Sequence, residues 1–151
     1  LVISKIRGYI SEFMQHYSNN IRVIDSMPIP VCEFGRAHFS KCFKGEASYG
    51  ICASKKETYF GFKFHALTTV DGFLTDYVIT PANIDDRNAV WDLCDKYRSI
   101  SIIGDKGYIN KRLTPELKSE RDIDLLFLKR ANSRDNYPKE VRQLLSKLEE
   151  G

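Results

Sequence analysis

Two extended runs joined by Asp71-Gly72 constrain the fold of this chain more than any other feature of its sequence. Residues 59–70 alternate apolar side chains with polar or small ones, and residues 73–80 form a second run rich in β-branched and aromatic residues. An Asp-Gly pair between two such runs favours a tight hairpin turn. The sequence therefore predicts an antiparallel pair of strands near the middle of the chain.

Hydrophobic periodicity predicts the elements on either side of this hairpin. In chain order they are a helix over 2–17, a strand over 21–24, a helix capped by Asp85 or Asp86, a strand over 100–103, a helix over 107–120 interrupted by Pro115, a strand over 124–129 and a helix beginning at Pro138. Pro28 and Pro30 are expected to end the first strand at Asp25, because proline cannot donate a hydrogen bond to a ladder. Residues 33–57 show no sustained period and are expected to form a long irregular loop or a small subdomain.

The order of these elements indicates an α/β fold. Early strands that can pair in antiparallel fashion, followed by alternating helices and strands, favour a mixed sheet with helices on both faces. The longest apolar run holds four residues, 125–128, whereas a membrane-spanning helix needs about 20, so no membrane partner is expected. Four cysteines without a Cys-x-x-Cys pair indicate free thiols and a cytoplasmic protein.

Charge is distributed unevenly, although the net charge of the chain is only +3. Residues 66–105 hold seven acidic and three basic groups, and the segments on either side are net basic. Clustered carboxylates hold divalent cations and basic segments attract phosphates, so the pattern is compatible with a metal-dependent enzyme acting on nucleic acid. An ordinary mixed surface is the alternative interpretation.

Two aspartates follow short apolar runs that are expected to be strands. Asp25 follows Ile-Arg-Val-Ile, and Asp105 follows Ile-Ser-Ile-Ile-Gly. Ligands of open α/β sheets bind outside the carboxyl ends of strands. If the two strands are parallel neighbours, their ends lie roughly 4.8 Å apart, and the hard oxygens of both carboxylates can hold Mg²⁺ or Mn²⁺. Turn formation or helix capping is the alternative role for both residues.

Four short motifs occur in a fixed order along the chain. They are Ile-Asp-Ser-Met-Pro at 24–28, Gly-Phe-Lys-Phe-His at 61–65, Pro-Ala-Asn-Ile-Asp-Asp at 81–86 and Gly-Asp-Lys-Gly-Tyr at 104–108. Together they resemble the catalytic domain of bacterial DDE transposases from insertion sequences, and among these insertion-sequence family nine-eight-two. Each motif alone is weak evidence, but four in register are specific. The resemblance extends from about Ile21 to the end of the chain.

This resemblance implies an RNase H-like fold in which the first and fourth predicted strands are parallel neighbours. It implies that Asp25 and Asp105 are catalytic, metal-binding acids, and that two Mg²⁺ or Mn²⁺ ions assist DNA strand cleavage and strand transfer. It implies DNA as partner, both transposon ends and target, and is compatible with a homo-oligomer on DNA. Residues 1–20 are then an N-terminal helix or linker, and residues 21–151 are the catalytic domain, with the fold expected to be incomplete at both ends.

A DDE site also needs a third acid, and the resemblance places this glutamate just beyond the last residue of the chain. The chain is therefore expected to be truncated and not to be a competent transposase by itself. Glu149 and Glu150, on the predicted last helix, are the candidates to replace the third acid. A non-catalytic DNA-binding remnant of a transposase and another RNase H-fold nuclease are the competing functions.

Basic and aromatic residues interleave over 33–65, which predicts a DNA-contacting segment because cations neutralise phosphates and aromatic rings stack on bases. The predicted DNA contacts, including one beside the second aspartate, are Arg36, Lys41, Lys44, Lys55, Lys56, Lys63, His65 and Lys106. The alternatives are that the aromatic residues belong to the core and that His65 is structural.

Overall fold

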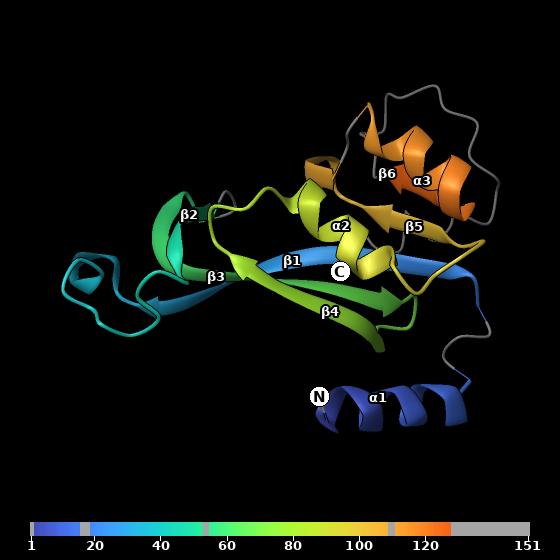
Figure 1. Cartoon of the computed structure of the whole chain (residues 1–151), viewed down its shortest axis with the longest axis horizontal. Coiled ribbons are helices and arrows are strands. Elements are labelled where there is room, and N and C mark those ends of the chain that lie inside the picture. Colours follow the sequence, from blue (N-terminus) through green and yellow to red (C-terminus); the bar gives the residue numbers. More distant parts are fainter. Residues whose placement is uncertain (1, 16–18, 53–54, 109–110, 128–151) are drawn as a thin grey trace.

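The computed structural model describes residues 2–15, 19–52, 55–108 and 111–127 (Figure 1). The elements in chain order are α1 (Val2–Phe13), β1 (Ile21–Cys32), η1 (Phe34–Arg36), β2 (Ser48–Cys52), β3 (Glu57–Thr69), β4 (Leu74–Pro81), α2 (Asp86–Cys94), β5 (Ser101–Gly104), η2 (Lys106–Tyr108), α3 (Leu113–Arg121) and β6 (Asp124–Phe127). The helix predicted from Pro138, with Glu149 and Glu150, lies outside the described residues.

The strands of this part of the chain form one mixed sheet. Its order is β2-β3-β1-β5-β6, and β4 also pairs with β3. β1 is antiparallel to β3 and parallel to β5, while β5 is parallel to β6. Since β1 and β5 contain the first and fourth predicted strands, their expected parallel pairing is confirmed. The mixed, RNase H-like α/β fold is confirmed with it.

The central hairpin forms where the Asp-Gly pair predicts it. β3 and β4 pair in antiparallel fashion, and the backbone N–H of Thr69 donates to the carbonyl oxygen of Phe73 over 2.8 Å. Gly72 has a φ of +86°, in the left-handed region that glycine adopts without a steric penalty. The turn therefore fixes the register of the two strands.

The core lies between one face of the sheet and the helices α2 and α3. Ile24, Leu67 and Ile102 contribute to it from three neighbouring strands, and the apolar sides of α2 and α3 complete the same buried cluster. Asp85 caps α2, as predicted, because its side chain accepts from the backbone N–H of Arg87. Leu113 and Leu117 are the buried residues of α3.

β1 is much longer than the sequence predicts. The strand continues through Asp25, Pro28 and Pro30 to Cys32 and stays paired with β3. Proline is tolerated there because β5 ends at Gly104, which pairs with Ile24, so the later part of β1 is an edge strand on that side. The expected end at Asp25 is therefore wrong, although Asp25 does follow the last residue that pairs with β5.

Two other segments differ from their predictions. Residues 33–57 contain the short helix η1 and the strand β2, which pairs with the first part of β3. The helix expected over 107–120 begins only at Leu113, and Pro115 falls in its first turn, where the missing N–H has no partner to lose. The tight turn η2 occupies the residues directly after Asp105.

α1 lies beside β4, which is an edge strand of the sheet, and β4 separates it from α2 and α3 (Figure 1). It ends at Phe13, not at residue 17. Its large apolar side chains are each more than half exposed; we call this set the α1 stripe, made up of Val2, Ile3, Ile6, Tyr9, Ile10, Phe13 and the adjoining Met14. The side towards the sheet carries Arg7 and the buried Ser11 instead.

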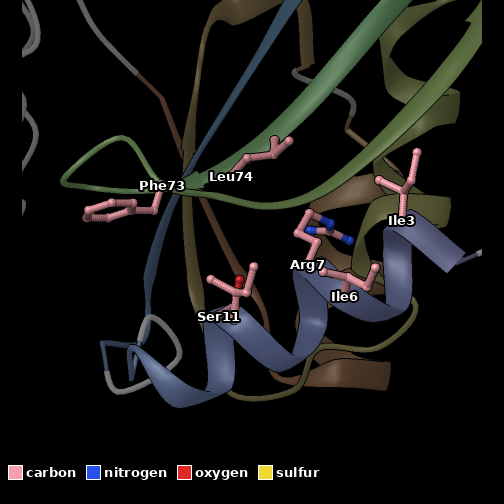
Figure 2. Close-up of a pocket in the computed structure, with 7 residues that line it drawn as sticks. Ile3, Ile6, Arg7, Ser11, Phe73 and Leu74 are labelled. Atoms are coloured by element: carbon pink, nitrogen blue, oxygen red, sulfur yellow. The ribbon is translucent and has the colours of Figure 1, made fainter.

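A salt bridge and a groove define the contact of α1 with the hairpin. Arg7 pairs with Asp76 over 3.1 Å and lies over the ring of Tyr77. Figure 2 shows Arg7 reaching from α1 towards the hairpin, with Phe73 and Leu74 at the hairpin end. A pocket of about 410 Å³ separates these two residues from one edge of the α1 stripe. None of the helices in the described ranges is long and apolar enough to cross a membrane.

Candidate active site

Asp25 and Asp105 lie side by side at the ends of the paired segments of β1 and β5. Ile24 and Gly104 are the last partners of the parallel register, and each aspartate is the next residue of its chain segment. Both side chains are exposed and line the same pocket, which has a volume of about 400 Å³. The fold therefore brings together the two acids that the sequence places at the end of apolar runs.

Gly104 permits this close approach. A Cβ atom at Gly104 would lie 2.6 Å from Cγ2 of Ile24 and 3.4 Å from Cδ2 of Tyr108. The first distance is far shorter than a normal carbon–carbon contact, whereas the second is an ordinary contact, so a larger residue would push β1 away from β5. The glycine before Asp105 thus sets the spacing between the two aspartates.

An ion pair crosses the pocket beside these carboxylates. The ammonium group of Lys63 on β3 lies 2.6 Å from Oδ1 of Asp86, the first residue of α2, and both side chains are largely shielded from solvent. Both residues line the pocket with Asp25 and Asp105. Helix capping, the role that the sequence suggests for Asp85 or Asp86, belongs to Asp85 alone.

Tyr108 lies beneath the pocket and connects the two strand ends. Its ring is buried, and its hydroxyl group shares hydrogen bonds with the side chains of Ser26 and His65. Burial raises the pKa of Tyr108, and the negative charges of Asp86, Asp25 and Asp105 raise it further. The hydroxyl group of Tyr108 is therefore close enough to all three carboxylates for their charges to disfavour its deprotonation.

His65 is completely buried, a position that favours its alternative structural role, and its DNA contact stays a prediction. Its Nε2 lies 3.0 Å from Oγ1 of Thr80, and its Nδ1 lies 3.4 Å from the hydroxyl oxygen of Tyr108. Burial lowers the pKa of His65, although Asp86 opposes this shift. The alternative structural role is the one that this geometry supports.

The other predicted DNA contacts are divided between an exposed segment and the pocket. Arg36, Lys41, Lys44, Lys55 and Lys56 are all exposed. Figure 1 shows the chain between β1 and β2 extending away from the helices. Lys63 lines the pocket, and Lys106 begins η2 directly after Asp105. None of these contacts is tested by the structure, so they stay predictions.

Aromatic residues of this segment are also accessible. Phe34, Phe39 and Phe43 are each more than half exposed, although all the rings make edge contacts with other aromatic side chains. Accessible aromatic rings beside lysines differ from the expectation that these rings belong to the core. Their exposure arises because the segment lies beyond the face that α2 and α3 cover.

Sequence reasoning missed Ser26, Asp86 and Tyr108 as residues of the site. All three lie inside the motifs 24–28, 81–86 and 104–108, so the signal was present in the sequence. Pairing of Lys63 with Asp86 needs the tertiary fold, because the two residues are 23 positions apart. Across the described residues, no group of three or more His, Cys, Asp or Glu side chains is arranged to hold a metal ion.

The fold and the site define a class: an RNase H-like sheet with two aspartates at the ends of neighbouring parallel strands. The sequence pattern of the family described as "Transposase DDE domain" matches residues 15–149. This match covers most of the chain, and the chain therefore belongs to the family of DDE transposase domains.

Among curated proteins, none matches the chain. Among solved structures, the piggyBac transposase in a synaptic complex with hairpin DNA is similar at 12% sequence identity and a TM-score of 0.47. The match covers 82% of this chain and 26% of the piggyBac transposase, so the chain spans about a quarter of the length of that protein.

Proposed function

We propose that this domain supplies Asp25 and Asp105, two of the three metal-binding acids with which a transposase cuts and joins DNA strands during transposition of a bacterial insertion sequence; with these two acids alone we expect it to be inactive. Residues 21–151 form the catalytic region and residues 1–20 precede it, in a cytoplasmic protein that resembles insertion-sequence family nine-eight-two. The observation that carries the proposal is the placement of both aspartates directly after the last paired residues of β1 and β5.

The residues at this place fit Mg²⁺ or Mn²⁺. Both ions prefer oxygen ligands, and Mg²⁺ usually keeps several waters while one or two carboxylates bind it. Asp25 and Asp105 are exposed to the same pocket, so water has access to the ion as well as to the carboxylates. Three carboxylates and one ammonium group, that of Lys63, line this pocket, and the excess of negative charge favours a cation there.

Divalent ions held by Asp25 and Asp105 would supply activation of a water or 3′-hydroxyl nucleophile and stabilisation of the leaving oxygen. The protein supplies the positions of these groups. Asp25 and Asp105 hold the cations, and Lys63 offers a positive charge to the phosphate that reacts. Asp86 keeps the Lys63 ammonium group at the pocket until DNA arrives.

The metal site is tested by titrating the protein with Mn²⁺ and following the free ion by electron paramagnetic resonance. We expect binding to the wild type and at least about tenfold weaker binding to Asp25→Asn and Asp105→Asn, because each substitution removes one charged ligand. Asp92→Asn is the matched control, since Asp92 is an exposed aspartate on α2 that does not line the pocket. Equal affinity in all four proteins would refute the site.

The DNA surface is proposed to be the exposed basic segment between β1 and β3. Arg36, Lys41, Lys44, Lys55 and Lys56 surround accessible aromatic rings, a combination that suits single-stranded or distorted DNA. β2 connects this segment to the pocket, because Ile51 and Cys52 line the same pocket as the two aspartates. DNA lying along this path would reach the two carboxylates.

Replacing Lys41, Lys44, Lys55 and Lys56 together by Ala should flatten the dependence of DNA affinity on salt by up to about four phosphate contacts. Replacement of the same four residues by Arg keeps the charge and should leave the slope unchanged. If the Ala variant keeps the wild-type slope, DNA binds elsewhere on the protein.

Cleavage separates the proposed activity from its alternatives. Joining of a 3′ end into target DNA, with loss of this activity in Asp25→Asn, indicates a transposase; cutting without joining indicates a nuclease. Binding of Mn²⁺ and DNA with no cleavage indicates a non-catalytic remnant. A homo-oligomer on DNA stays a prediction, and the α1 stripe is the candidate surface for it.

A further inference from the structure

A continuous set of hydrogen bonds leads through the buried His65 to the first of the two aspartates. It begins at Thr80 on β4, passes through His65 on β3 to Tyr108 in η2, and reaches Ser26 on β1. The backbone N–H of Ser26 then donates to Oδ1 of Asp25 over 2.7 Å. Four segments that are distant in the sequence are connected in this way.

Tyr108 is hydrogen-bonded both to Asp105 and to the neighbour of Asp25. Its backbone N–H donates to the carbonyl oxygen of Asp105 over 3.1 Å, which closes the turn η2. Its hydroxyl group bonds to Ser26, the neighbour of Asp25. The position of one buried ring is therefore linked to the backbone that carries each aspartate.

We propose that His65 and Tyr108 are positioning residues that set the distance and orientation of Asp25 and Asp105 for a divalent ion. They act through Ser26 and η2, and neither residue lines the pocket itself. The proposal rests on the metal site proposed above. It gives a function to the histidine of the 61–65 motif and the tyrosine of the 104–108 motif.

The chemistry of His65 suits this role. A neutral imidazole has one donor and one acceptor, so it can bond Thr80 and Tyr108 at the same time. Burial lowers the pKa of His65 and favours this neutral form. Partners that orient the ligands of a metal ion typically change metal affinity about 10–100-fold when removed.

The test compares Mn²⁺ affinity in Tyr108→Phe and in Tyr97→Phe. Tyr108→Phe keeps the buried ring and removes only the hydroxyl group, and we expect roughly tenfold weaker Mn²⁺ binding. Tyr97 is a buried tyrosine of the same core that does not line the pocket, so Tyr97→Phe should bind Mn²⁺ like the wild type. Circular dichroism shows whether each variant is folded.

Each result bears on the proposal. Wild-type affinity in folded Tyr108→Phe overturns it while leaving the metal site intact. If Tyr108→Phe does not fold, Ser26→Ala removes the same hydrogen bond from the surface side and should weaken Mn²⁺ binding by a similar factor. Equal Mn²⁺ binding by the wild type and Asp25→Asn refutes the metal site itself, which is a separate failure.

The α1 stripe carries a second and independent inference. Seven large apolar side chains, two of them aromatic, are each more than half exposed; at roughly 100 Å² each they offer an apolar area on the order of 700 Å². This exceeds the largest patch of a typical monomer and approaches the roughly 800 Å² that each partner contributes to a standard interface. The stripe therefore has the size of one half of a dimer contact.

Charges beside the stripe indicate which partner fits. Lys5 and Glu12 are both exposed and lie seven residues apart, two turns along one flank of α1. When two copies of a helix pack in antiparallel orientation, the same flanks meet. Lys5 of each copy then faces Glu12 of the other, so the pairing forms two symmetrical ion pairs.

We infer that the α1 stripe packs against the α1 stripe of a second copy of this chain in antiparallel orientation. Sedimentation equilibrium of the full chain should show a dimer, and Ile6→Asp should weaken it at least about tenfold because it buries a charge in the contact. Lys5→Glu should weaken the dimer as well, since like charges then face one another.

The double variant Lys5→Glu/Glu12→Lys distinguishes the partner. In antiparallel pairs it restores both ion pairs, so its dimer should be as stable as that of the wild type. In a parallel pair, Lys5 faces Lys5 and the exchange restores nothing. A wild-type monomer at concentrations up to about 1 mM, or no recovery in the double variant, overturns the inference.

Discussion

The helices α1 and α2 have similar lengths and opposite environments. The apolar side of α2 is buried completely, with Val90, Leu93 and Cys94 at 0 to 1% exposure, whereas every member of the α1 stripe is more than half exposed. α2 connects β4 to β5 and crosses the sheet, so its apolar side faces the core. α1 precedes β1 and turns a polar side with Arg7 towards β4. An apolar pattern therefore predicts a helix but does not identify what covers it.

The largest expected effect compares one leucine of α2 with one isoleucine of α1. Leu93→Ala should lower the free energy of unfolding by about 2–5 kcal/mol, because it removes buried methyl groups and leaves a cavity. Ile6→Ala should change it by no more than about 0.5 kcal/mol in dilute monomer. Urea unfolding monitored by circular dichroism measures both. Similar losses in the two variants would show that α1 is covered within the monomer.

A second substitution tests the packing of the sheet on the side that α2 and α3 cover, at Gly104. Gly104→Ala should lower the free energy of unfolding by about 1–3 kcal/mol, because the added Cβ meets Ile24 at 2.6 Å and overpacks the strand ends. The control is Gly35→Ala, where nothing lies within 4 Å of the added atom. Urea unfolding of the two variants should differ clearly, and an unchanged Gly104→Ala would mean that β1 and β5 separate at little cost.

The parallel pairing of β1 with β5 is implied by the family resemblance, whereas local patterns predict the hairpin and the cap of α2. These features depend on neighbouring residues: the Asp-Gly turn, the Asp85 cap and the alternation of apolar positions. The length of β1 is not predictable in this way, because Pro28 is acceptable only where β5 has ended. Whether a strand is at the edge is a property of the assembled sheet.

Some features of the candidate site can likewise be predicted from the sequence, and others depend on the tertiary fold. Asp25 and Asp105 are identified by their place after apolar runs, and the family match supports the resemblance that the four motifs indicate. The pairing of Lys63 with Asp86 and the burial of His65 require the packing of α2 and η2 against the sheet. The motif containing His65 is found in the sequence, but its position within the molecule is not.

The cap of α2 offers a smaller effect with a dependence on pH. Asp85→Ala should lower the free energy of unfolding by about 1 kcal/mol, whereas Asp85→Asn should keep most of it, since Asn also caps helices well. Hydrogen bonds from Arg87 hold the pKa of Asp85 below its ordinary value. A carboxylate with a lowered pKa stabilises the folded state above its ordinary pKa, and this contribution is lost as the pH falls through the lowered pKa.

Unfolding of the wild type and Asp85→Asn between pH 7 and about pH 2 measures this dependence. The difference between the two proteins should shrink as the pH falls below about 4, the ordinary pKa of aspartate. The pair is partly exposed, so the difference should be small throughout. A difference that grows in acid would contradict the assigned role of Arg87.

The smallest expected effect has the opposite sign and lies in α1. Gly8 has nothing within 4 Å of an added Cβ, and glycine inside a helix is less favourable than alanine by roughly 0.5–1 kcal/mol. Gly8→Ala should therefore slow hydrogen exchange of the α1 amides about two- to fivefold, the factor that corresponds to this energy. The free energy of global unfolding should change little, because few contacts couple α1 to the core. If Gly8→Ala instead raises the free energy of global unfolding by the same amount, α1 and α2 unfold as one cooperative unit. The two helices then differ only in how far their apolar side chains are exposed to solvent.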